Sequence, residues 1–202
     1  MPLYLGVDDT DSLRGMCTTY LATELIRALP DWDLIGYPRL VRLNPNIPWK
    51  TRGNGAICLR LGKGRGRAFR VGSIDGREVL AYTRGTEAVP SEALAGDAAA
   101  VVERWAALDD PTTNPGLVLL RKPPPPGLYW RAVRDVVPKR DALRSIRGLG
   151  LRREWKNGRG VIGAAAAAAW RPRDRTYEVL AYRDPSRWGT RREIPAASVR
   201  TL

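Results

Sequence analysis

A short apolar run near the start of the sequence leads into its densest group of reactive side chains. Leu3–Val7 is followed by three carboxylates and two hydroxyls: Asp8, Asp9, Thr10, Asp11 and Ser12. A buried strand that ends in a polar loop is where open α/β sheets bind ligands. Because crowded carboxylates repel one another, we predict that the aspartates bind Mg²⁺ with a nucleotide phosphate, which the two hydroxyls also contact. The alternative is a loop whose aspartates form Asx-turns and cap the next helix.

Two adjacent threonines stand at the predicted start of that helix. Gly15 leads into the segment, and Thr18 and Thr19 follow at a position where free amide groups and the helix dipole attract phosphate. A phosphate held there can be transferred to a threonine hydroxyl. Plain N-capping is the alternative, and these residues alone favour it.

A long, rigid loop over residues 44–55 ends in groups that suit phosphate. Lys50 offers a point charge and Arg52 a bidentate fork. Glycines beside these side chains let backbone amides approach a ligand, so the predicted contacts here are Lys50, Arg52, Gly53, Asn54 and Gly55. The chain contains no GxxxxGK[ST] motif, which excludes a P-loop. An ordinary surface turn between two strands remains the alternative.

A second glycine-rich stretch precedes an alanine-rich run. Gly158, Arg159 and Gly160 lead into a predicted helix, whose N-terminus offers another anion site. Alternatively, the glycines only permit close packing against a sheet.

The pattern of apolar and turn residues predicts a mixed α+β protein. Predicted strands cover residues 3–7, 34–43, 55–61, 69–74, 78–83, 116–120, 129–137, 151–155 and 176–183. Predicted helices cover residues 18–29, 91–108, 139–146 and 160–170. Four prolines at 123–126 make a stiff spacer, which predicts two domains, 1–125 and 126–202. The element order of the second approximates a ferredoxin-like α+β unit.

Charge is divided unevenly along the chain. Residues 1–125 hold 16 Lys and Arg against 14 Asp and Glu, whereas residues 126–202 hold 18 against 7. A basic half of this kind is typical of a surface that binds a polyanion, and nucleic acid is the leading class of partner. The alternative is a composition that enriches arginine everywhere.

The remaining composition excludes several classes of protein. The chain has no histidine and no CxxC pair, and Cys17 and Cys58 are its only cysteines, so a side-chain zinc site is not expected. Neither a membrane-spanning apolar stretch nor a secretory signal is present, and 44% hydrophobic residues allow a real core. We therefore expect a cytoplasmic protein without membrane association.

Five segments together resemble one enzyme family, the archaeal tRNA(Ile) 2-agmatinylcytidine synthetases. They are VDDTDSLRGMCTTYL, GYPRLVRLNPNIPWKTRGNGA, TTNPGLVLL, NGRGVIGAAAA and TYEVLAYR, in this order and at the family's spacing. The resemblance implies a kinase-like α/β domain followed by a ferredoxin-like α+β domain. It also implies that ATP and agmatine are used to replace the C2 oxygen of the wobble cytidine in a tRNA(Ile) with a CAU anticodon.

The resemblance assigns roles to the motif residues. It implies that C2 is first activated by phosphorylation and that Thr18 is itself phosphorylated. It strengthens the interpretation of Asp8, Asp9 and Asp11 as metal-binding and catalytic residues. It also strengthens the interpretation of Lys50 and Arg52 as phosphate ligands. Relatives continue into an OB-fold and a zinc ribbon, which this sequence does not include. We therefore expect either an N-terminal part of such an enzyme or a shortened homologue that works with a partner.

Two other functions remain open at this point. Asp9-Thr10-Asp11 after a strand approximates the DxDx[TV] signature of aspartyl-phosphate phosphohydrolases, although Leu13 stands where Thr or Val is expected. A non-catalytic RNA-binding module is the third possibility, in which the basic half binds RNA and the carboxylates are structural.

Overall fold

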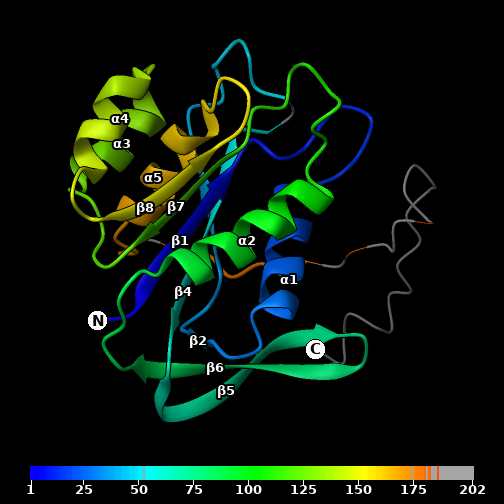
Figure 1. Ribbon diagram of the computed structural model, residues 1–202, viewed down its shortest axis with the longest axis vertical. Coiled ribbons are helices and arrows are strands. Elements are labelled where there is room, and N and C mark those ends of the chain that lie inside the picture. Colours follow the sequence, from blue (N-terminus) through cyan, green and yellow to red (C-terminus); the bar gives the residue numbers. More distant parts are fainter. Residues whose placement is uncertain (52, 174, 181, 183–185, 187–202) are drawn as a thin grey trace.

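The computed structural model describes the whole chain except residues 52, 174, 181, 183–185 and 187–202. In this part, one mixed sheet is covered by helices on both faces (Figure 1). Its strands are β1 (Leu3–Asp8), β2 (Asp33–Ile35), β3 (Arg39–Arg42), β4 (Gly55–Gly62), β5 (Gly64–Ile74), β6 (Arg77–Gly85), β7 (Gly116–Leu120) and β8 (Gly150–Glu154). Its helices are α1 (Thr18–Ala28), α2 (Glu92–Trp105), α3 (Gly127–Arg134), α4 (Lys139–Ile146) and α5 (Gly160–Ala169). The predicted mixed α+β class is confirmed.

The sheet places β1 near its centre. The strand order is β5-β6-β2-β4-β1-β7-β8, with β3 also paired to β4. All pairs are antiparallel except β2 with β6. Because β1 runs antiparallel to both neighbours, its carboxyl end lies beside the starts of β4 and β7, and the loops at this edge converge on Asp8.

The alternation of side chains along β1 divides the core into two layers. Leu3, Leu5 and Val7 pack with α1 and α2, whereas Tyr4 packs with α3, α4 and α5 on the opposite face. Since residues two apart share a face, Gly6 and Asp8 also point toward the second layer. Asp8 therefore ends its strand beneath α5.

Helix α5 approaches the sheet unusually closely because small residues line the contact. All six alanines from Ala164 to Ala169 are fully buried. A Cβ on Gly6 would lie 2.3 Å from the carbonyl oxygen of Ala164, and one on Gly116 only 1.9 Å from the amide nitrogen of Val161. These contacts set the depth at which the N-terminus of α5 meets β1 and β7.

Three predicted strands need correction. Residues 34–43 form two strands, β2 and β3, with a turn between them. The turn contains Gly36, whose φ is 74°, and Pro38. Residues 129–137 belong mostly to α3, because Leu128 and Ala132, four residues apart, bury one helical face. Residues 176–180 and 182 form no strand, and Val179 is 72% exposed there; positions 181 and 183 lie outside the described residues.

The other predicted elements are present. β7 and α4 begin and end where they were expected, and the hairpin turns at Asp75 and Gly76, both of which have positive φ. The division into domains at residue 125 stays a prediction; in the structure β8 pairs with β7 across that position. None of the helices in the described part is long and apolar enough to span a membrane.

Candidate active site

A cavity of about 190 Å³ opens at the sheet edge where β1 and β3 end and β4 begins. The N-terminal turns of α1 and α5 both reach it, as do the loop after β3 and the turn between α3 and α4. Its charged lining residues within the described part are Asp8, Asp9, Asp11, Asp135, Arg42, Lys50 and Arg159. Carboxylates, cations and two positive helix ends thus surround one space, which suits a phosphate with a cation.

Asp8 is the most perturbed acid in this cavity. Burial raises its pKa to about 8, and the neighbouring charges of Asp9 and Asp11 add to the rise. A hydrogen bond from the backbone N–H of Asp9 and the charge of Arg159 oppose it only in part. A cation close to Asp8 would reverse this rise, so the carboxylate group favours a positively charged guest.

Asp9 is held by an arginine from the far half of the chain. Arg159 Nε donates to Asp9 Oδ2 at 2.8 Å, and the same guanidinium donates to the carbonyl of Thr112 at 2.6 Å. Burial raises the pKa of Asp9, against the opposing charge of Arg159. The backbone of Asp9 is left-handed, with φ of 57°, a conformation that aspartate tolerates better than most residues. The ion pair therefore fixes the start of α5 onto the acidic loop.

Thr18 is the first residue of α1 and is only 5% exposed. Thr10 Oγ1 donates to Thr18 Oγ1 at 3.1 Å, so the second hydroxyl orients the first. The N-cap is Cys17, and no side chain caps the helix. Capping by Thr18 or Thr19, expected from the sequence, is therefore wrong, because the Thr18 hydroxyl is engaged by Thr10 and both threonines line the cavity.

The loop after β3 contributes Lys50, Gly53, Asn54 and Gly55 to the cavity. Asn54 Nδ2 donates to the carbonyl of Asn44 at 2.8 Å and so closes the base of the loop. A Cβ on Gly55 would lie 3.3 Å from a terminal nitrogen of Arg42, so this glycine makes room for a guanidinium. Arg52 lies outside the described residues.

Four predicted contacts lie away from the cavity. Thr10 is buried behind Thr18, and Ser12 Oγ accepts the backbone N–H of Arg14. Gly15 closes the turn with Ser12. A Cβ on Gly158 would meet Glu154 and Lys139, so that glycine serves packing on the β8 side. Gly160 does line the cavity, and it also packs tightly against β7.

Several lining residues were not expected from the sequence. Arg42 and Asp135 add charge, while Trp49, Ile162 and Gly163 add apolar surface. Arg42 lies just before the predicted loop and could have been found by extending it, whereas Trp49 lies within that loop and was not chosen as a contact. Asp135 lies within residues 129–137, which were predicted as a strand, so its position at the end of α3 depended on recognising that helix.

No three Asp, Glu, Cys or His side chains in the described part are grouped closely enough to hold a metal ion by themselves. Magnesium requires only one or two carboxylates when phosphate oxygens and water complete its shell. The residues present therefore fit a cation shared with a nucleotide, and they do not fit a metal cage made only of protein ligands.

The pKa of Asp8 predicts how stability depends on pH. Without a ligand, the native state keeps the proton on Asp8 up to about pH 8, while the unfolded chain releases it near its ordinary pKa of 3.8. Wild type therefore loses stability as pH rises between these values. Asp8→Asn should gain about 1.4 kcal/mol relative to wild type for each pH unit between pH 5 and 7.

Urea unfolding at pH 5, 6 and 7 measures this difference. Asp97→Asn, which changes an exposed aspartate of α2, is the matched control and should follow wild type. Parallel pH profiles for wild type and Asp8→Asn would show that Asp8 ionises normally in the native state.

Two protein-family models match the chain in sequence. The model described as the TiaS TCKD domain matches residues 4–155, and the one described as the TiaS FLD domain matches residues 158–202. The chain belongs to the TiaS family. The TCKD and FLD domains follow one another in this order, and the family boundary falls between residues 155 and 158.

Named relatives agree with this family. The 2-agmatinylcytidine synthetase TiaS of Thermoplasma volcanium, which acts on an isoleucine tRNA, is 42% identical over 186 residues, which cover 91% of this chain and 42% of that protein. A solved complex of TiaS with an isoleucine tRNA and ATP has 36% identity and a TM-score of 0.75, over 100% of this chain and 44% of that one. A complex of TiaS with an isoleucine tRNA, AMPCPP and agmatine has 33% identity and a TM-score of 0.74. The chain spans less than half the length of these TiaS proteins.

Proposed function

We propose that this chain binds Mg²⁺ and ATP in the cavity at the end of β1 and uses them in the synthesis of agmatinylcytidine on a tRNA. The observation that carries the proposal is the convergence of Asp8, Asp11 and Thr18 with the N-termini of α1 and α5. Lys50 adds a mobile point charge for phosphate oxygens. The names of the TiaS relatives, and their complexes with ATP and AMPCPP, support the nucleotide.

In this proposal the acidic loop provides the magnesium site. Asp8 and Asp11 both line the cavity and are the carboxylates proposed to hold the ion, while Asp9 holds Arg159 in place. When bound, Mg²⁺ neutralises charge on the phosphate oxygens. Gly160 and Gly163 at the start of α5 line the same space, and Arg159 keeps that helix end in position.

The proposed reaction has two steps. The γ-phosphoryl group of ATP passes to the C2 oxygen of the wobble cytidine, and the amine of agmatine then displaces that oxygen as phosphate. Agmatine carries an amine and a guanidinium, so its site needs carboxylates; the cavity offers those of the acidic loop and Asp135. The complexes of relatives with an isoleucine tRNA and agmatine support these substrates.

A kinase-like step on the protein is part of the proposal. Thr18 lines the cavity beside the aspartates, and its hydroxyl already accepts a hydrogen bond from Thr10. Its own proton is therefore directed elsewhere. Burial keeps Asp8 protonated near neutral pH, but a bound Mg²⁺ would lower that pKa and leave a carboxylate in the same cavity that could accept the Thr18 proton. We propose that Thr18 receives a phosphoryl group from ATP.

A phosphohydrolase with Asp9 as nucleophile is less favoured. The Asp9 carboxylate accepts from Arg159 and from the backbone N–H of Asn114, which leaves it poorly available for attack. An acyl phosphate on Asp9 would be labile to alkali, whereas phosphate on Thr18 would be stable to acid. Labelling with ATP followed by acid and alkali treatment therefore separates the two.

The decisive test is mass spectrometry of nucleosides. The chain is incubated with ATP, agmatine and a tRNA(Ile) transcript with a CAU anticodon, alone and with the portion of a TiaS relative that lies beyond the matched residues. We expect agmatinylcytidine with that portion and little without it. If agmatinylcytidine is absent from both reactions while the tRNA still binds in a salt-dependent way, the synthetase proposal is wrong and the chain is a non-catalytic RNA-binding module.

A further inference from the structure

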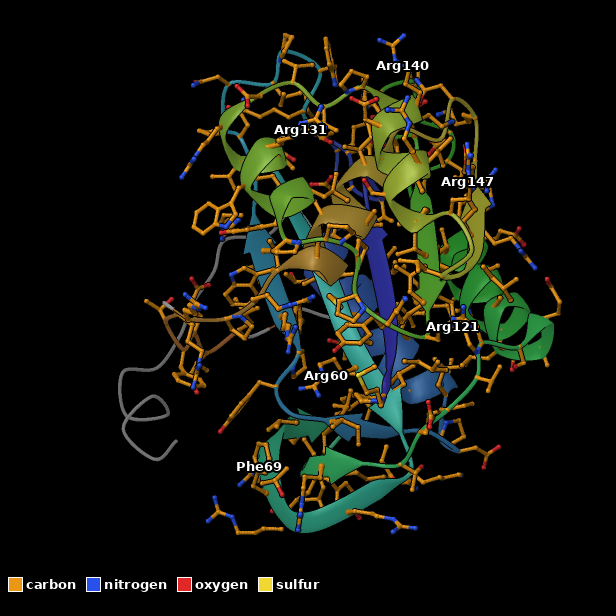
Figure 2. The ribbon with its side chains drawn as sticks, turned by 90° about the vertical axis from the view of Figure 1, so that its left-hand side faces the viewer. Arg60, Phe69, Arg121, Arg131, Arg140 and Arg147 are labelled. Atoms are coloured by element: carbon orange, nitrogen blue, oxygen red, sulfur yellow. The ribbon has the colours of Figure 1, made fainter. Side chains whose placement is uncertain are left out.

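Two arginines lie on the α5 side of the sheet, outside the cavity. Arg39 on β3 is the register partner of Cys58, and Arg60 on β4 is the register partner of Tyr4. Because Cys58 and Arg60 are two residues apart, all four side chains share one face of the sheet. Figure 2, which looks onto the helices of this side, shows Arg60 on β4 beyond the end of α5.

Aromatic rings hold both guanidinium groups in place. Arg60 lies over the ring of Tyr4 with 5.9 Å to its centroid, and Arg39 lies over Trp170 at the same distance. A terminal nitrogen of Arg39 also donates to the carbonyl of Trp170 at 3.4 Å. Stacking of this kind fixes the plane of a guanidinium without neutralising its charge.

Neither arginine has a carboxylate partner in the part of the chain that the structure describes. Arg60 Nε is buried and makes no hydrogen bond. Burial lowers the pKa of Arg39, and the positive charges of Arg60 and Arg171 act in the same direction. Gathering like charges and leaving a buried donor unsatisfied both cost stability, which an anion bound at this point would recover.

We propose that Arg39, Arg60 and Arg171 form an anion site that takes a backbone phosphate of the RNA substrate. The choice of RNA rests on the proposed function. None of the three arginines lines the nucleotide cavity, so the site is separate from that of ATP. Arg131 and Arg140 lie on helices of the same side (Figure 2) and share the single carboxylate of Asp141, so net positive charge remains there for a polyanion that reaches Arg60.

The test measures binding of a labelled tRNA(Ile) transcript to the full chain across a series of salt concentrations. Arg60→Gln and Arg171→Gln should each weaken binding by roughly tenfold and lower the slope of log K against log salt by about 0.7 to 0.9. Arg171 is exposed, so its replacement leaves the fold intact even if Arg60→Gln does not fold. Arg60→Lys, which keeps the charge, should retain most of the slope.

The control is Arg70→Gln, because Arg70 is an exposed arginine of the same sheet that is already paired with Glu78. It should match wild type within about twofold. Parallel titrations with ATP and with inorganic phosphate identify the source of the anion. Unchanged RNA affinity and slope in both Arg60→Gln and Arg171→Gln would overturn the site, as would a loss of ATP or phosphate binding with RNA binding intact.

This outcome is separable from that of the proposed function. If nucleoside analysis finds no agmatinylcytidine while Arg60→Gln still lowers the salt slope, the synthetase proposal fails and the phosphate site stands. If the product forms and the slope is unchanged in these variants, only the phosphate site fails.

Discussion

Replacing Thr18 by valine is expected to abolish phosphate transfer from ATP to the protein and to lower agmatinylcytidine formation by about 10³-fold or more. Valine keeps the shape of threonine at a position that is only 5% exposed. It removes the hydroxyl that receives the phosphoryl group, and it leaves Thr10 Oγ1 without its acceptor, at a cost of about 1 kcal/mol in stability. Intact-protein mass spectrometry after incubation with ATP, together with nucleoside analysis, measures both effects.

Two variants make this result specific. Thr18→Ser retains a hydroxyl and should keep phosphate transfer, whereas Thr19→Val changes the neighbouring hydroxyl of the same cavity and should leave transfer to Thr18 in place. Undiminished labelling of Thr18→Val would remove Thr18 from the mechanism. Labelling that disappears only in Thr19→Val would move the acceptor by one residue.

Gly116→Ala should produce the largest loss of stability. The new Cβ would lie 1.9 Å from the Val161 amide nitrogen and 2.3 Å from the Gly160 carbonyl carbon, both of which are backbone atoms that no rotamer change can move. We expect a loss of about 3 kcal/mol or more, which lowers Tm by roughly 6 to 12 °C for a chain of this size. Gly116 is also the register partner of Asp8, so nucleotide binding should weaken as α5 is displaced.

Gly96→Ala is the matched control. Gly96 lies within α2, where no atom stands within 4 Å of a new Cβ. Alanine should therefore raise stability by about 0.5 to 1 kcal/mol, because it restricts the unfolded chain and favours helix. Calorimetry of both variants gives the comparison. A Gly116→Ala protein that melts with wild type would mean that α5 stands farther from β7 than the structure places it.

Local sequence patterns were sufficient to predict those strands and turns whose apolar and turn residues favour one type of secondary structure. The apolar run 116–120 is five residues long, which favours a buried strand over a helix, and the hairpin is set by Asp75 and Gly76. Residues 129–137 were predicted as a strand, although Leu128 and Ala132, four residues apart, also fit one face of a helix. Contact between α3 and α5 decides in favour of the helix.

Site residues that stand at the end of a strand or the start of a helix could be predicted from the sequence. Pairings between residues of distant elements could not. Strand ends and helix starts could be located in the sequence, so Asp8 and Thr18 were candidates from the outset. The pairing of Asp9 with Arg159 joins residues 150 positions apart, and no local pattern reveals it. Ser12 was misplaced because its turn with Gly15 directs it away from the cavity. The roles of these residues stay predictions.

The central position of β1 has a consequence for biosynthesis. Among the strands it leaves the ribosome first, yet its partners β4 and β7 begin at Gly55 and Gly116, and its cover α5 begins at Gly160. At about 5 to 20 residues per second, roughly ten to thirty seconds separate the synthesis of β1 from that of α5. For most of this time β1 lacks β7 on one edge and α5 on one face, even after β4 has been made, so nascent chains should engage holding chaperones until residue 169 has emerged.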